Sequence, residues 1–264
     1  MSKTEASEII KFKKECEANI ARYSEDEEWR RLSIDWLVRG CKHKYMLNFK
    51  SLGRPIIQTP IDMVASQELI WEVKPDLIIE TGIAHGGSLI MSASMLAMID
   101  YCEAVESGQT LDPKATWRHV LGLDIDIRQH NREAIEGHPM AHRINIIEGS
   151  SISPEIIGQV HEISKEYDRV LVFLDSNHTH DHVLAELEAY APLTSKESYC
   201  VVFDTVIEDL PDDVCPDRPW CKGNNPKTAV WEFLKAHPEF EINKQFNDKL
   251  VITTQPDGYL KRVR

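Results

Sequence analysis

The sequence lacks the features that mark secreted and membrane-spanning proteins. Its six cysteines lie singly along 264 residues without a CxxC pair, which argues against a disulfide framework or a zinc site and favours reduced thiols. No apolar run approaches the ~20 residues that cross a bilayer. The first twenty residues mix charges with apolar positions at helical spacing, unlike a signal peptide. We therefore expect a cytoplasmic protein without a membrane span.

Basic residues are also fewer than acidic residues. Thirty Lys and Arg stand against 43 Asp and Glu, and the formal net charge is −13 at pH 7. The phosphates of nucleic acid and of anionic lipid repel a chain with this charge. Neither is expected as a partner.

Short β-rich segments alternate with helical segments from residue 75 onward, which predicts βαβ units and a parallel sheet. Five segments are predicted to be parallel strands: 76–80, 120–124, 144–147, 169–175 and 199–204. Two later segments, 240–246 and 249–254, are separated by Asn247 and Asp248 and predict an antiparallel hairpin. The expected fold is therefore α/β, with a Rossmann-like sheet of seven strands.

The first 71 residues have a different pattern. Residues 1–40 have helical spacing, residues 41–60 look irregular, and Thr59-Pro60 then opens another helix. We expect a helical cover over residues 1–71, whose last part forms a lid, and a main domain over residues 72–264.

A glycine-rich turn follows the first predicted strand in DLIIETGIAHGGSLIMS. Its glycines let the backbone approach a ligand, and the next helix offers unpaired N–H groups. The turn is an imperfect dinucleotide fingerprint, because Ala84 replaces the middle glycine and Asp124 lies 42 residues beyond Gly82 instead of about 20. One alternative is a loop of the S-adenosylmethionine type, with Glu80 at the methionine part and Asp124 at the ribose. Another is a tight turn without a ligand.

Three aspartates end predicted strands, and the carboxyl ends of parallel strands meet at one edge of the sheet. They are Asp124, Asp175 and Asp204. Carboxylates from neighbouring strands repel each other unless a proton or a cation lies between them. A hard divalent ion suits Asp175 and Asp204, and Glu208 could complete its shell.

Three histidines follow in SNHTHDHV, which starts at Ser176. His178 could face a hydroxyl that the metal polarises and serve as its general base. The same segment also predicts the start of a helix with Asp181 in its first turn, so His180 and His182 are expected to be structural or exposed. A histidine in a polar loop is more often a cap or a surface residue, and this alternative stays open for His178.

Several long motifs, in order along the chain, resemble one known family. They include IIETGIAHGGSLI, VFLDSNHTHDHV, VVFDTVIED and the ending KLVITTQPDGYLKR. Together they resemble the cephalosporin hydroxylases and rhamnosyl O-methyltransferases, from about residue 45 to the C-terminus. Despite the hydroxylase label, this family has the S-adenosylmethionine-dependent methyltransferase fold and looks related to metal-dependent enzymes that methylate sugar hydroxyls.

The resemblance implies a cofactor, a metal and a base. S-adenosylmethionine would be held by Glu80, Gly82, Ala84, Gly86, Ser88, Asp124, Ser150 and Ser151. Mg²⁺ would be held by Asp175 and Asp204, with Glu208 as a further ligand, and His178 would be the base. Related enzymes commonly carry a second ligand directly before the last aspartate, where this chain has Phe203. The resemblance also implies a homo-oligomer.

The acceptor is expected to be a sugar or glycan precursor, or another small molecule. The irregular segment 211–226 is the candidate for its pocket, because long loops usually carry function or cover a site. Arg218 would contact a hydroxyl or a phosphate, and Trp220 would stack on the acceptor or plug the core. Asn225-Pro226 predicts a helix cap.

Two other function classes stay open. One is an oxidoreductase, either NAD-linked or a non-haem iron oxygenase. The iron oxygenase would need a 2-His-1-carboxylate site, for which His237-Pro238-Glu239 is weak support. A catalytically silent cofactor-binding scaffold is suggested by Phe203.

Overall fold

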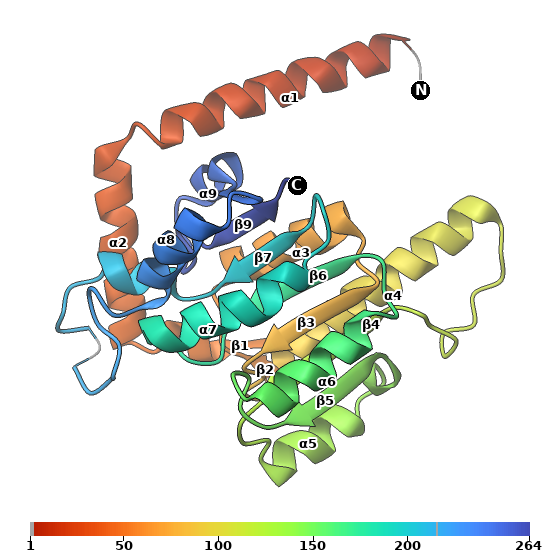
Figure 1. Cartoon of the computed structure of the whole chain (residues 1–264). Helices are drawn as coiled ribbons and strands as arrows, with labels where there is room; N and C mark the ends of the chain where they lie inside the picture. The colour runs from red at the N-terminus through yellow and green to blue at the C-terminus, as the bar shows by residue number, and fades with distance from the viewer. Residues whose placement is uncertain (1–2, 215) are drawn as a thin grey trace.

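Seven strands form one sheet in the order β5-β4-β3-β6-β7-β9-β8 (Figure 1). This computed structural model describes residues 3–214 and 216–264. The strands of the sheet are β3 (Leu77–Thr81), β4 (His119–Asp124), β5 (Ile144–Glu148), β6 (Val170–Leu174), β7 (Tyr199–Val202), β8 (Phe240–Ile242) and β9 (Tyr259–Arg262). The five strands β3 to β7 are parallel, as predicted, and β9 pairs antiparallel with both β7 and β8.

Helices cover both faces of the sheet. One face carries α6 (Pro154–Ser164), α7 (His180–Tyr190) and α8 (Pro226–Ala236), and the other carries α3 (Pro60–Val73), α4 (Gly87–Ser107), α5 (Gln129–Glu136) and α9 (Lys244–Leu250). Each face has its own core cluster of buried side chains, typified by Val172 and Leu187 on the first and by Ile78 and Leu96 on the second. The Rossmann-like α/β sheet expected from the sequence is confirmed.

Parallel register brings the ends of the strands to one edge. Thr81 of β3 pairs with Leu123 of β4 and with Leu174 of β6. The residues that follow these positions therefore emerge side by side, and they include Gly82, Asp124 and Asp175. This edge is where ligands bind in doubly wound sheets.

The N-terminal part forms two helices instead of one continuous helix. These are α1 (Lys3–Tyr23), which runs along the top of Figure 1, and α2 (Glu27–Lys42). Asp26 begins the second, because its side chain accepts a hydrogen bond from the Trp29 amide at 2.8 Å. The segment expected to be irregular contains a 3-10 turn, η1 (Tyr45–Asn48), and a short antiparallel pair, β1 (Phe49–Ser51) and β2 (Arg54–Ile56).

Helix α3 begins where the sequence predicted. Thr59 caps it by accepting from the Asp62 amide, and Pro60 occupies its first turn. Its Leu69 and Ile70 are fully buried in the same core cluster as α4. The boundary expected at residue 71 therefore falls inside a helix that belongs to the core.

The predicted hairpin of residues 240–246 and 249–254 is wrong in its second strand. Asn243 accepts a hydrogen bond from the Phe246 amide and so begins helix α9, and the strand that pairs with β8 is β9, several residues later. The Thr254 amide is not free for a ladder, because it donates to the buried carboxylate of Asp62, as do the hydroxyls of Thr253 and Thr254. A buried carboxylate needs such donors, and it ties α3 to the C-terminal segment.

Helix α4 is long and apolar enough to span a membrane by length and composition. Its Leu89, Ala93 and Leu96 are fully buried against the sheet, in the core cluster. Core packing therefore accounts for its apolar character.

Three short 3-10 helices complete the elements. They are η2 (Ala141–Arg143), η3 (Ala191–Leu193) and η4 (Thr205–Asp209), of which η4 follows β7 directly at the edge described above.

Candidate functional site

The glycine turn after β3 lies tightly against the end of β6. Gly82 has φ +81°, and a Cβ at this position would lie 2.1 Å from the carbonyl oxygen of Asp175. Gly86 also has positive φ, and a Cβ there would meet Ile135. Ala84, which stands where a fingerprint glycine was expected, has φ 44°. This left-handed conformation is uncommon for a residue with a side chain, so the turn keeps its shape without the middle glycine of the fingerprint.

Glu80 is buried beneath this turn. Ser88, in the first turn of α4, donates a hydrogen bond to Glu80 Oε1, and Glu80 Oε2 has no hydrogen-bond partner among the described residues. Burial raises the pKa of Glu80 to about 7. Glu80, Ser88, Gln58 and Asp175 line one small cavity. An unpaired carboxylate oxygen in such a place suits a cationic group of a ligand.

Asp124, at the end of β4, holds the glycine turn. Its Oδ2 accepts from the amides of Ile83, at 2.9 Å, and Ala84, at 3.3 Å, and its Oδ1 accepts from the amide of Asp126. A carboxylate has about four lone-pair sites, so Asp124 can still accept a hydroxyl from a ligand.

A cavity of about 100 Å³ opens beside Asp124. Ser150 and Ser151, which were predicted to lie near an adenine, line this cavity, and so does His182, which was expected to be structural or exposed. The ring of His182 lies 3.1 Å from the hydroxyl oxygens of both Ser151 and Ser176. One sequence signal for it is its position in the first turn of α7.

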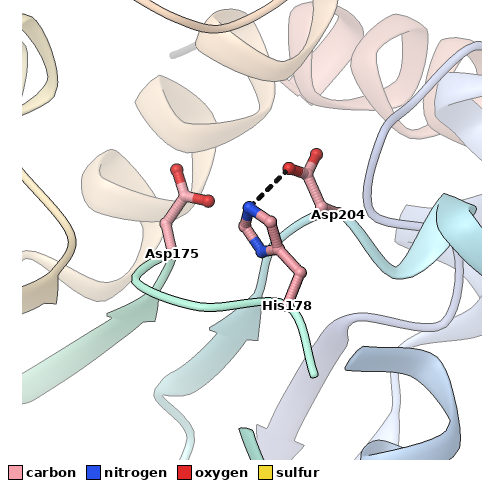
Figure 2. Close-up of side chains that lie close together, drawn as sticks. All are labelled: Asp175, His178 and Asp204. Atoms are coloured by element: carbon pink, nitrogen blue, oxygen red, sulfur yellow. Dashed lines mark ion pairs between the residues drawn. The ribbon is translucent and has the colours of Figure 1, made fainter. Parts of the chain in front are cut away.

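Asp175, His178 and Asp204 form a compact group at the same edge (Figure 2). One ligand atom from each lies within 4.8 Å of the others. His178 Nε2 is 3.3 Å from Asp204 Oδ2. Asp175 follows β6 directly, His178 lies on the loop to α7, and Asp204 is the N-cap of η4 with a left-handed φ of 55°. Strained backbone of this kind clusters at functional sites.

Electrostatics at Asp175 favour a bound cation or proton. Burial, and then the negative charges of Asp204 and Glu80, raise the pKa of the Asp175 carboxyl well above its usual range. Two carboxylates and one imidazole are suitable donors for a divalent metal. The three residues predicted for metal and base are therefore brought together.

Glu208 lies apart from this group. Its Oε2 accepts from the Gly223 amide at 2.8 Å and from the side-chain amide of Asn225. These bonds direct the carboxylate to the loop that precedes α8, because the loop's own donors need an acceptor. Glu208 is therefore a loop anchor in this structure.

Phe203 belongs to the core and cannot donate a ligand. It is buried, and its ring meets Phe173 edge to face at 5.7 Å between centroids. The position next to Asp204 thus contributes apolar packing.

The loop 211–226 reaches the site through Trp220. The indole meets the ring of His178 edge to face, with 4.7 Å between centroids, and the guanidinium of Arg218 lies over the indole at 5.1 Å. Asn225 caps α8, as predicted, through a reciprocal pair of hydrogen bonds with Thr228. Residue 215 lies outside the described residues.

Two other histidines have structural partners. His180 binds the Thr228 hydroxyl through Nδ1 at 2.8 Å. His237, proposed for an iron site, lies between Glu188 and Glu239 at the far end of α8.

A larger cavity, of about 640 Å³, lies between α2 and α9 and contains none of the predicted site residues.

Known proteins resemble the chain over most of its length. A family model described as "Rhamnosyl O-methyltransferase/CmcI" matches residues 43–263. A rhamnosyl O-methyltransferase of Mycobacterium tuberculosis (strain ATCC 25618 / H37Rv) is 30% identical over 206 residues, covering 76% of this chain and 73% of that protein. One of Mycobacterium leprae (strain TN) is 28% identical over 215 residues, 80% of this chain and 82% of that protein.

A solved structure described as "cmcI-D160 Mg-SAM" has a TM-score of 0.50 and 18% sequence identity, covering 83% of this chain and 78% of that one. The range matched by the family model contains every predicted site residue.

Proposed function

Because this chain belongs to the rhamnosyl O-methyltransferase/CmcI family, as its motifs indicated, we propose that it transfers a methyl group from S-adenosylmethionine to a sugar hydroxyl. Family membership favours methyl transfer over the oxidoreductase alternative. The relatives are named for a rhamnosyl acceptor, and we propose a hydroxyl of a rhamnosyl-type sugar or glycan precursor as the acceptor here.

One observation supports the proposal: Asp175, a candidate catalytic residue, lines the same cavities as the candidate cofactor residues. Asp175 lines the cavity that contains Glu80 and Ser88, and also the one formed by the glycine turn. Its amide donates to the Thr81 carbonyl at 2.9 Å. A methyl donor held by the turn would therefore lie beside Asp175, His178 and Asp204.

The buried oxygen atoms of this cavity suit the positive charge of the methyl donor, S-adenosylmethionine. Among the described residues, Glu80 Oε2 and Gln58 Oε1 have no hydrogen-bond partner, and both side chains line the same small cavity. The methionine part of the cofactor carries an ammonium group, which would supply the missing donors. The remaining acceptor capacity of Asp124 would serve the ribose hydroxyls, and the cavity at Ser151 would take the adenine.

The reaction needs a deprotonated oxygen aimed at the methyl carbon. The O–CH₃ bond forms as the S–CH₃ bond breaks, the bonding electrons stay on sulfur, and the hydroxyl proton passes to His178. Asp204, 3.3 Å from His178 Nε2, stabilises the imidazolium that results. General-base catalysis of this kind contributes ~10²–10⁴-fold.

The donor set also fits Mg²⁺, which would be held by Asp175 and Asp204 and would lower the pKa of the acceptor hydroxyl when bound. With Phe203 beside Asp204, water and acceptor oxygens would complete the shell. The acceptor would lie against Trp220, which already flanks His178, with Arg218 behind it. Assembly into a homo-oligomer and a cytoplasmic location stay predictions.

The proposal is tested by incubating the protein with methyl-labelled S-adenosylmethionine, MgCl₂ and a panel of rhamnosides. Label in the sugar, lost in the Asp175→Asn variant, supports it. Binding of S-adenosylhomocysteine without transfer to any sugar would support the silent-scaffold alternative that Phe203 suggests.

A further inference from the structure

Helix α7 holds Ser151 at two points. The Tyr190 hydroxyl donates to the Ser151 carbonyl oxygen, and His182 Nε2 lies 3.1 Å from Ser151 Oγ. Ser151 is 6% exposed and lines the cavity of about 100 Å³ beside Asp124. The position of this hydroxyl is therefore set by a neighbouring helix as well as by its own loop.

The hydrogen bonds around His182 determine where its proton lies. Ser176 donates its hydroxyl proton to Glu186 Oε1 at 2.7 Å. A serine hydroxyl has one proton, so Ser176 Oγ can only accept from His182 Nε2, 3.1 Å away. Nε2 is therefore protonated. Glu186, which is fully buried, thus fixes the tautomer of His182.

The proton on His182 Nε2 determines whether the Ser151 hydroxyl donates or accepts. The protonated Nε2 of His182 also faces Ser151 Oγ, which therefore accepts. The proton of the Ser151 hydroxyl is then free for a ligand in the cavity. The series of hydrogen bonds from Glu186 through Ser176 and His182 to Ser151 therefore ends in a hydroxyl donor that is oriented before any ligand binds.

We propose that His182 is a positioning residue, which together with Glu186 orients the Ser151 hydroxyl as a donor to N1 of the adenine. This inference rests on the proposed function, which places the adenine in this cavity. N1 of adenine is an acceptor, whereas the corresponding nitrogen of hypoxanthine carries a proton. A donor fixed at this point would therefore select adenosyl over inosyl ligands.

The test measures binding of two probes, S-adenosylhomocysteine and S-inosylhomocysteine, by calorimetry on the full chain. Wild type should prefer the adenosyl compound by at least tenfold, about the effect of one hydrogen bond. Ser151→Ala should lose most of that preference. His182→Asn should do the same, because the shorter side chain cannot reach Ser151 and the freed hydroxyl can rotate to accept. Glu186→Gln should weaken the preference for the adenosyl compound, since the glutamine amide can donate to Ser176 and so reverse the direction of the hydrogen bonds.

His180→Asn is the matched control. It makes the same change on the same helix, but the side chain faces Thr228, and asparagine keeps a polar atom where Nδ1 lies. It should keep the wild-type preference. A folded His182→Asn variant with unchanged preference would overturn the inference, as would equal weakening of both probes by Ser151→Ala. If wild type binds neither probe, the proposed function fails and the inference fails with it.

Discussion

Gly82 lies so close to Asp175 that no side chain fits between them: a Cβ at position 82 would lie 2.1 Å from the Asp175 carbonyl oxygen. The end of β6 and the glycine turn after β3 are therefore in direct contact. Under the proposed function this contact joins the cofactor turn to the catalytic group.

Gly82→Ala should abolish binding of S-adenosylhomocysteine and lower stability. The left-handed φ alone costs alanine roughly 1–2 kcal/mol, and the clash must in addition move the turn or Asp175. Gly108→Ala is the control, because Gly108 also has positive φ, but beyond its chain neighbours no atom of the described residues lies within 4 Å of its Cβ position. Calorimetry and thermal unfolding measure both effects. If the two variants bind the cofactor product equally well, the close contact has no role in binding.

His178→Ala should lower turnover by ~10²–10⁴-fold while S-adenosylhomocysteine still binds. The base acts on the acceptor hydroxyl, and the ring does not line the small cavity at Glu80. Initial rates with a rhamnoside acceptor, compared with binding by calorimetry, separate the two. Near-normal turnover in this variant would remove His178 from its role.

Asp175→Asn should remove Mg²⁺ binding, whereas Glu208→Gln should not. Asp175 lies with His178 and Asp204 in a group that could hold a metal, whereas Glu208 accepts a hydrogen bond from the Gly223 amide. Titration with Mn²⁺, followed by electron paramagnetic resonance, reports the affinity of each variant directly. Loss of binding in Glu208→Gln would restore Glu208 as a ligand, and chelator-insensitive activity of wild type would count against the metal.

Most of the fold follows from sequence pattern, because buried parallel strands are continuous apolar runs between helical segments. The five parallel strands and the glycine turn were predicted in this way. The second strand of the hairpin was predicted wrongly, because the apolar segment KLVITT has the pattern of a strand. In the structure the Thr254 amide and the hydroxyls of Thr253 and Thr254 bind Asp62, almost 200 residues earlier. Such a long-range contact has no local signal.

Part of the candidate site was predictable for a related reason. Aspartates at strand ends converge by topology, so Asp175 and Asp204 could be paired from sequence. The direction of a side chain could not be predicted from sequence. Glu208, four residues beyond Asp204, points to the loop at Gly223. His182 was predicted to be structural or exposed, because only the packing of α7 against Ser151 places its ring at a cavity.

Glu80 should make the stability of the unliganded protein depend on pH. Its folded-state pKa is about 7, above the ordinary value of 4.5. The stability that this group contributes is therefore complete below the unfolded-state pKa and is lost as the pH rises through about 7, with a total effect of roughly 3 kcal/mol. Thermal unfolding between pH 5 and 8 should show this fall in wild type and a weaker one in Glu80→Gln. Parallel curves for the two proteins would contradict the assignment.

The most direct measurement is a crystal structure of the protein with S-adenosylhomocysteine and MgCl₂. We expect the amino group at Glu80, the ribose at Asp124, and the sulfur facing Asp175, His178 and Asp204, with the metal on the two aspartates. A ligand bound away from the glycine turn, or a sulfur directed away from these three residues, would contradict the proposal that donor and base meet at this edge of the sheet.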